Sequence, residues 1–164
     1  MTNISRRNLF TLGATSATGA LLFAGLRQSP AIAAGNFPVH HTPAEWQKQL
    51  GPARYNILRN AGTEAPFSSP LNNEHRRGTF VCAGCAQPNF SSTTKFDSGT
   101  GWPSFWAPLK GSVAETRDST LGMVRREIHC TRCGGHLGHV FDDGPKPTGL
   151  RYCMNGLALG FHPA

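Results

Sequence analysis

The stretches Cys82-Ala-Gly-Cys85 and Cys130-Thr-Arg-Cys133 decide the fold of this 164-residue chain. Each is a Cys-x-x-Cys pair, and a tight turn of that length directs two thiolates at one metal ion. Because 44 residues separate the pairs, a shared metal would join two parts of the fold that are distant in sequence. Four thiolates fill a tetrahedral site, so the sequence predicts one structural zinc ion rather than a catalytic metal.

Two other interpretations of these cysteines stay open. The pairs can form two disulfides, or one pair can be a redox-active Cys-x-x-Cys. Alternatively, His136 or His139 replaces one sulfur, because both follow Cys133 at three-residue intervals. That replacement would free a thiolate and would make the metal catalytic.

Composition indicates a single loop-rich domain with a modest core. The chain has 19 Gly and 12 Pro but only 15% charged residues, which favours β structure. A fold of this kind gains from a structural metal. The formal charge is +7. Removal of residues 1–33 takes away Arg6, Arg7 and Arg27, so 13 basic and 9 acidic residues remain and the charge falls to +4. A balance this mild and scattered argues against nucleic acid as a partner.

The first 33 residues have the pattern of an export signal. Arg6 and Arg7 precede an apolar stretch, and Ala31-Ile32-Ala33 is a small-residue cleavage pattern. Paired arginines are typical of twin-arginine signals, whose cargo crosses the membrane folded. We therefore expect a signal at 1–33, a domain at 34–164, periplasmic export and no stable membrane association after cleavage; a retained anchor is the alternative. Folding around zinc before export would protect four thiols from an oxidising compartment.

Helix signals are confined to the start of the domain. Thr42-Pro43-Ala44-Glu45 is a capping box that predicts a short helix to Leu50, and a second helix is expected from Pro52 to just before Gly62. Later segments alternate like strands. These are Phe80–Val81, residues 123–129, residues 150–154 and residues 157–161. The turn-rich segment 90–108 holds Phe96, Trp102, Phe105 and Trp106, which we expect to line a site.

Cys153 has no cysteine partner if the other four bind zinc. On a strand, Arg151, Cys153 and Asn155 would share one face, while Tyr152 and Met154 would face the core. A cation beside a thiol favours the reactive thiolate, so the sequence predicts a nucleophile. The alternative is a small buried hydrophobic residue. Asn155-Gly156 is also a turn signal, which can take Asn155 out of the strand.

Two histidines follow the second cysteine pair in His136-Leu137-Gly138-His139. We interpret this segment as a loop that the metal holds in place. Imidazoles held beside a lone cysteine can supply an acid near neutral pH.

Together these motifs resemble one family, the methionine-R-sulfoxide reductases of class B, from about Trp46 to Phe161. Besides both cysteine pairs, the landmarks are Arg59-Asn60-Ala61-Gly62-Thr63-Glu64, Phe96-Asp97-Ser98-Gly99-Thr100-Gly101-Trp102-Pro103-Ser104-Phe105, His136-Leu137-Gly138-His139-Val140-Phe141 and Arg151-Tyr152-Cys153-Met154-Asn155. The resemblance implies a mainly β fold of two antiparallel, barrel-like sheets, with short N-terminal helices. It also implies that the zinc site stands away from the reaction.

The resemblance further implies a mechanism. The Cys153 thiolate would attack the sulfur of methionine sulfoxide and be left as a sulfenic acid. His136, His139 and Asn155 would be the candidates for protonating the oxygen. Arg151 would help to hold the thiolate. For the substrate, the resemblance implies binding by Trp102 together with Phe105, with Trp102 facing its methyl group.

One departure from the family sets the expected cycle. Many members carry a second, resolving cysteine where this chain has Thr100. We therefore expect an external thiol reductant, such as a thioredoxin-like protein, to regenerate Cys153. Oxidised exported proteins are the expected substrates and a monomer is the default. The rival classes are a zinc-knuckle binding module without catalysis and a metal hydrolase, which lacks a His-x-Glu arrangement here.

Overall fold

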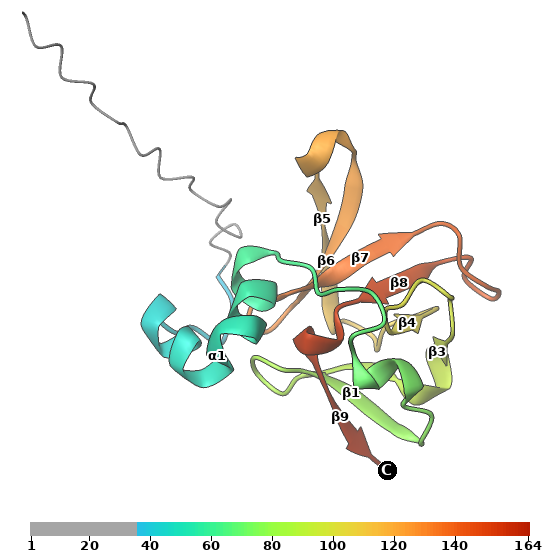
Figure 1. Ribbon diagram of the computed structural model, residues 1–164, viewed down its shortest axis with the longest axis horizontal. Helices are drawn as coiled ribbons and strands as arrows, with labels where there is room; N and C mark the ends of the chain where they lie inside the picture. Colours follow the sequence, from blue (N-terminus) through green and yellow to red (C-terminus); the bar gives the residue numbers. More distant parts are fainter. Residues whose placement is uncertain (1–35) are drawn as a thin grey trace, which may run out of the picture.

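The computed structural model describes residues 36–164, so the predicted signal segment 1–33 lies outside the described residues. In the described part, a helix α1 (Pro43–Asn60) precedes nine strands (Figure 1). The strands are β1 (Gly78–Cys82), β2 (Pro88–Ser91), β3 (Lys95–Phe96), β4 (Ser104–Phe105), β5 (Val113–Asp118), β6 (Arg125–Cys130), β7 (His136–Phe141), β8 (Arg151–Met154) and β9 (Leu159–Pro163). Single helical turns are η1 (Pro70–Asn73), η2 (Ser92–Thr94), η3 (Thr120–Gly122) and η4 (Gly156–Ala158).

Helix α1 contains the two predicted helical segments, joined at a kink. The Thr42 hydroxyl accepts from the Glu45 N–H at 3.3 Å, and the Glu45 carboxylate accepts from the Thr42 N–H at 2.7 Å. Gly51 interrupts the helix with φ +69° and ψ 169°, after which Pro52 restarts it. The left-handed Ala61 ends it. The predicted capping box and break are confirmed, although the two segments form one kinked helix.

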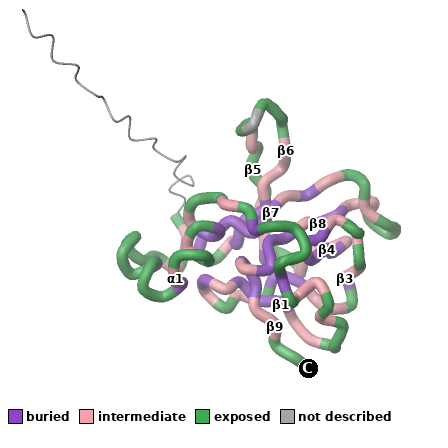
Figure 2. Tube along the Cα trace, viewed as in Figure 1, coloured by how far each residue is buried: buried purple, intermediate pink, exposed green. Residues whose placement is uncertain are grey.

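The strands form two antiparallel sheets, as predicted. One has the order β2-β1-β9 and the other the order β3-β4-β8-β7-β6-β5. In Figure 1 the β5–β6 hairpin projects from the body of the protein. Figure 2 shows mostly exposed residues toward the end of this hairpin and buried residues at the centre of the protein. Strand β8 therefore lies inside the larger sheet, where both of its edges are paired.

Aromatic side chains join the two sheets. Phe80 and Phe90 come from the small sheet, and the ring of Phe105 in the large sheet lies 4.9 Å and 4.4 Å from their centroids. All three side chains are fully buried. Such contacts add about 0.5–1.5 kcal/mol per pair to the free energy of burial, so they fix how the two sheets face each other.

The sequence missed five strands, namely β2, β3, β4, β5 and β7. The segment that begins at His136 is a six-residue strand in the middle of the large sheet, not the predicted loop. The turn-rich segment 90–108 also contributes the short strands β3 and β4. Within residues 36–164, no helix has the length and apolar character needed to cross a membrane.

Candidate active site and metal centre

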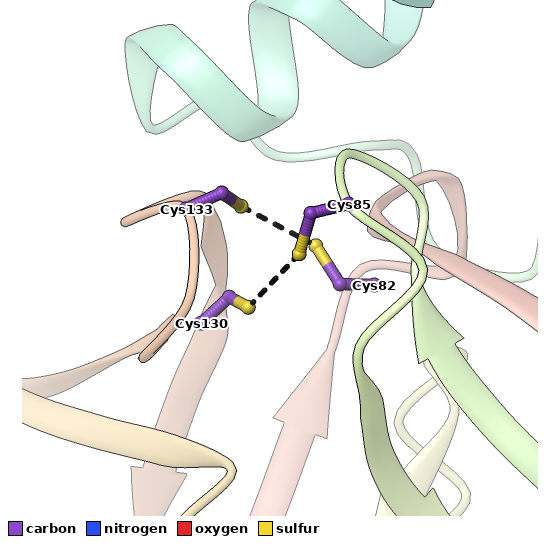
Figure 3. Close-up of side chains that lie close together, drawn as sticks. All are labelled: Cys82, Cys85, Cys130 and Cys133. Carbon is purple, nitrogen blue, oxygen red and sulfur yellow. Dashed lines mark hydrogen bonds between the residues drawn. The ribbon is translucent and has the colours of Figure 1, made fainter. Parts of the chain in front are cut away.

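Four cysteine side chains converge where β1 and β6 end (Figure 3). Their sulfur atoms all lie within 4.8 Å of one another, and the closest pairs are Cys82–Cys133 at 3.7 Å and Cys85–Cys130 at 3.6 Å. Tetrahedral ligands at a zinc–sulfur distance of about 2.3 Å stand about 3.8 Å apart. The cluster therefore has the size and chemistry of a four-thiolate metal site, and it joins the small sheet to the large one.

The two cysteine turns have the same backbone hydrogen bonds. The N–H of Ala86 donates to the carbonyl of Cys82 at 2.8 Å, and the N–H of Gly134 donates to the carbonyl of Cys130 at 2.9 Å. Ala86 and Gly134 both adopt the left-handed region, with φ of 59° and 66°. This local fold aims both thiols of each pair to one side.

Two alternatives for the cysteines are wrong. The closest sulfur pairs stand well beyond the S–S bond length of about 2.05 Å, so the structure contains four free thiols and no disulfide between them. His136 and His139 bind carboxylates instead of joining the cluster. Among the described residues, the four cysteines alone could hold a metal ion, and four thiolates are a donor set typical of a structural site.

Cys153 lies in the middle of the large sheet, opposite Ser104 of β4 on one side and His139 of β7 on the other. Because directly opposed residues point to the same face of a sheet, these three side chains share a face. Glu127 of β6 extends the same row beyond His139. As predicted, Tyr152 and Met154 face the core, and Cys153 is half-buried.

The environment of Cys153 favours the thiol over the thiolate. Burial raises the pKa of the Cys153 thiol, and the Thr100 hydroxyl and the Arg151 charge only partly oppose it. Thr100 Oγ1 lies 3.9 Å from the sulfur. Arg151 makes two hydrogen bonds of 2.8 Å to Asp143 and lies over the ring of Phe141 at 4.5 Å. As predicted, the charge of Arg151 favours the thiolate by lowering the pKa of Cys153, but burial raises that pKa by more.

A β-bulge brings the two histidines to one face of the sheet. His136 is opposite His129, while Gly138 is opposite the neighbouring Ile128, so Leu137 is an extra residue in β7. A bulge shifts the alternation of side chains by one position. As a result, His136 and His139, three residues apart, have ring centroids only 5.4 Å apart.

Each histidine is bonded to a carboxylate. His136 Nδ1 donates to Glu127 at 2.8 Å, and His139 Nε2 donates to Asp118 at 2.8 Å. Since a carboxylate only accepts, these bonds place a proton on those nitrogens. Hydrogen bonding by His136 lowers the pKa of Glu127, whereas burial lowers the pKa of His139. The Nε2 of His136 is buried without a partner among the described residues.

Asp118 is held from several sides. Burial opposes its ionisation, but hydrogen bonds from Thr120 and His139 and the charge of Arg125 outweigh burial and lower its pKa. Both the N–H and the hydroxyl of Thr120 donate to it, at 2.9 and 2.7 Å. Residues at the tip end of the exposed hairpin thus fix the position of His139.

Asn155 leaves the strand, as its turn signal allowed, and precedes η4. Its side-chain oxygen accepts from the N–H of Glu64 at 3.0 Å, and its Nδ2 donates to the carbonyl of Leu137 at 3.3 Å. Both ends of the amide therefore bond to the backbone. The structure places Asn155 as a link between three segments and gives it no bond to Cys153.

Trp102 and Phe105, the two predicted substrate contacts, lie in different environments. Trp102 is half-buried, and its indole N–H donates to the carbonyl of Glu64 at 3.2 Å. Phe105 is fully buried, and it is opposite Tyr152 on the core face. The structure therefore leaves Trp102, but not Phe105, partly exposed, between Thr100 and Ser104, the two residues placed beside Cys153.

Glu64 is a functional-site residue to which the sequence gave no role. Its buried carboxylate accepts from the N–H of Leu157 at 3.0 Å and from the N–H of Gly156. Its backbone holds Trp102 and Asn155. One residue thus fixes both the segment after Cys153 and the indole, and no spacing in the sequence signals contacts between positions about ninety residues apart.

Comparison with known proteins agrees with this site. Residues 50–163 match the family described as the SelR domain. The peptide methionine sulfoxide reductase MsrB of Agrobacterium fabrum is 57% identical over 126 residues, which cover 76% of this chain and 93% of that protein. The proteins of the same name from Leptospira interrogans and Pseudomonas putida are 53% and 52% identical, over 97% and 95% of their lengths.

The fold and these matches define the class as SelR-domain proteins. The chain belongs to the methionine-R-sulfoxide reductase B family.

Proposed function

We propose that this chain is a peptide-methionine (R)-S-oxide reductase whose nucleophile is Cys153. The observation that carries the proposal is the position of Cys153 in a family member: half-buried, next to Thr100, and opposite a carboxylate-bound His139. The four remaining cysteines are gathered in the metal cluster. Cys153 is thus the one thiol of the described residues that stands apart from that cluster.

In the first step, the Cys153 sulfur attacks the sulfur of the sulfoxide. The thiol gives up its proton and the sulfoxide oxygen receives one. The bond between that oxygen and the methionine sulfur breaks, so methionine leaves and the hydroxyl passes to the Cys153 sulfur, which becomes a sulfenic acid. The cysteine sulfur is oxidised by two electrons and the methionine sulfur is reduced by two. Because one proton leaves and one arrives, no net proton is drawn from solvent.

His139 is the best-placed group to accept the proton that the Cys153 thiol gives up. It lies opposite Cys153, and its bond to Asp118 leaves Nδ1 as the free nitrogen. With a pKa lowered by burial, His139 is neutral at pH 7 and can accept the thiol proton. His136, whose Nε2 has no partner among the described residues, is the second candidate. Asn155 acts by holding the segment after Cys153.

An external thiol completes the proposed cycle. Thr100 at 3.9 Å from the sulfur cannot form a disulfide, and the other cysteines would hold zinc. One reductant thiol condenses with the sulfenic acid and releases water, and a second thiol then reduces the mixed disulfide. Zinc, when bound, would stabilise the fold through Cys82, Cys85, Cys130 and Cys133 and would take no part in these steps.

Single turnover without reductant tests the function. The metal-loaded domain should release about one methionine per chain from the R epimer of a sulfoxide peptide and none from the S epimer. The variant Cys153→Ser should release none. Metal-loaded protein that releases no methionine from either epimer would refute the proposal.

We also propose that the substrates are exported proteins and that the mature domain is a periplasmic monomer. The support is the paired Arg6-Arg7 motif of the predicted signal, which lies outside the described residues. Replacing both arginines with lysine should retain the chain in the cytoplasm in a fractionation experiment. Sedimentation of the mature domain as a dimer would refute the monomer.

A further inference from the structure

A pocket of about 210 Å³ lies beside the candidate active site. Trp102 and Pro103 form part of its wall, so the pocket adjoins the surface on which a methionine sulfoxide would bind in the proposed function. Its remaining lining residues are Phe67, Asn72, Asn73, His75, Lys95, Phe96, Asp97 and Gly101. The volume is below the range of about 300–1,000 Å³ that is typical of small-molecule sites, and it suits one large side chain.

Phe67, one of the lining residues, is held in place by its backbone. Its side chain is 73% exposed, and its φ of +62° lies in the left-handed region that bulky residues rarely adopt. The N–H of Phe67 donates to the carbonyl of Gly101 at 2.7 Å. A Cβ at Gly101, where φ is +91°, would come within 2.8 Å of that nitrogen, so glycine permits the contact. The pocket wall is therefore built before any ligand binds.

The pocket wall combines three large aromatic side chains with a majority of polar residues among the others. Phe67, Phe96 and Trp102 offer apolar surface, whereas the charged group of Lys95 is engaged: its Nζ donates to the carbonyl of Asn72 at 2.8 Å. Asn72 is also engaged, because its Nδ2 donates to the carbonyl of Gly101 at 2.9 Å. These two polar groups thus brace the wall, and the three aromatic faces are the apolar surface that the pocket offers to a ligand.

We propose that this pocket is a subsite for a bulky apolar side chain that neighbours the methionine sulfoxide in a peptide substrate. Successive residues of an extended peptide are about 3.3–3.6 Å apart along the chain, so a neighbour of a sulfoxide at Trp102 reaches the adjoining wall. This inference rests on the proposed function and deepens it, since it makes Phe67 a determinant of specificity for peptides.

The test compares blocked R-sulfoxide tripeptides that carry leucine or glycine on either side of the oxidised methionine. We expect kcat/KM to be about tenfold higher with leucine on one side, which corresponds to about 1.4 kcal/mol. Phe67→Asn should bring the ratio close to one, because asparagine accepts a positive φ but lacks the aromatic face. Phe67→Leu should retain the preference.

Met123→Ser is the matched control, since it removes another exposed apolar side chain, at the tip of the β5–β6 hairpin, and should leave the ratio unchanged. A leucine-to-glycine ratio of one in the wild type, or the same ratio in Phe67→Asn, would overturn the subsite. A preference for glutamate, drawn by Lys95, would overturn its apolar character. Loss of reduction of every peptide and of free methionine sulfoxide would instead overturn the proposed function.

Discussion

Replacing Glu64 with glutamine should loosen the segment that follows Cys153. The carboxylate accepts two backbone hydrogen bonds, from Gly156 and Leu157, in a buried position. A bond to a charged acceptor contributes about 1.5–3 kcal/mol, and a buried donor left without a partner costs about as much. Glutamine keeps one acceptor but turns an NH₂ group toward an N–H donor. We therefore expect Glu64→Gln to lower the free energy of unfolding by about 3 kcal/mol.

Urea denaturation of the metal-loaded domain measures this change. With a slope of about 2 kcal/mol per molar urea, the midpoint should fall by about 1.5 M. The matched control is Glu115→Gln on β5, whose exposed carboxylate makes only a 3.5 Å ion pair with Arg126. That change should stay within about 0.5 kcal/mol. If Glu64→Gln were as stable as the control, the reasoning about the two buried hydrogen bonds would be refuted.

Three further predictions concern the sulfur sites and the histidine partner. Thr100→Val should raise the pKa of Cys153 further, because the hydroxyl opposes the effect of burial; alkylation by iodoacetamide should then need a higher pH, whereas Thr100→Ser should resemble the wild type. The pKa of Asp118 is lower in the folded protein than in the unfolded chain, so the ionised carboxylate stabilises the fold. This contribution to the free energy of unfolding should be complete above about pH 5 and should be lost as the pH falls toward 2. The stability difference from Asp118→Asn should follow that course in urea titrations, and a constant difference would contradict it. Cys82→Ser should lose the metal, as measured by metal analysis, and should unfold, as measured by circular dichroism. Cys153→Ser should retain one metal ion per chain.

Local chain geometry explains which parts the sequence could predict. A Cys-x-x-Cys turn confines two thiols within four residues, so the metal cluster follows once both pairs are recognised. The capping box at Thr42 and the break at Gly51 depend likewise on neighbouring residues. The position of Cys153 apart from the other cysteines was predictable because it has no partner and because alternation along β8 sets its face, whereas its role as nucleophile stays a prediction.

Features that depend on distant contacts could not be predicted in this way. Gly134 and Gly135 directly precede strand β7, and Gly138 lies within it. The bulge at Leu137 also removes the alternation that identifies a strand. The burial of Phe105 follows from its stacking on Phe90, which only the packing of the sheets reveals. The role of Glu64 depends on contacts with Gly156 and Leu157, which are distant from it in the sequence.

The register of strand β8 has a consequence for the accuracy of folding. Shifting β8 by one residue would turn Tyr152 and Met154 out of the core and bury Cys153. Exposing two large apolar side chains costs about 3–6 kcal/mol together. A misaligned strand would then occur in between about one chain in 140 and one in 20,000. The same apolar residues that exclude this error also keep the Cys153 sulfur on the opposite face of the sheet, so correct folding by itself places the sulfur where the proposed mechanism needs it.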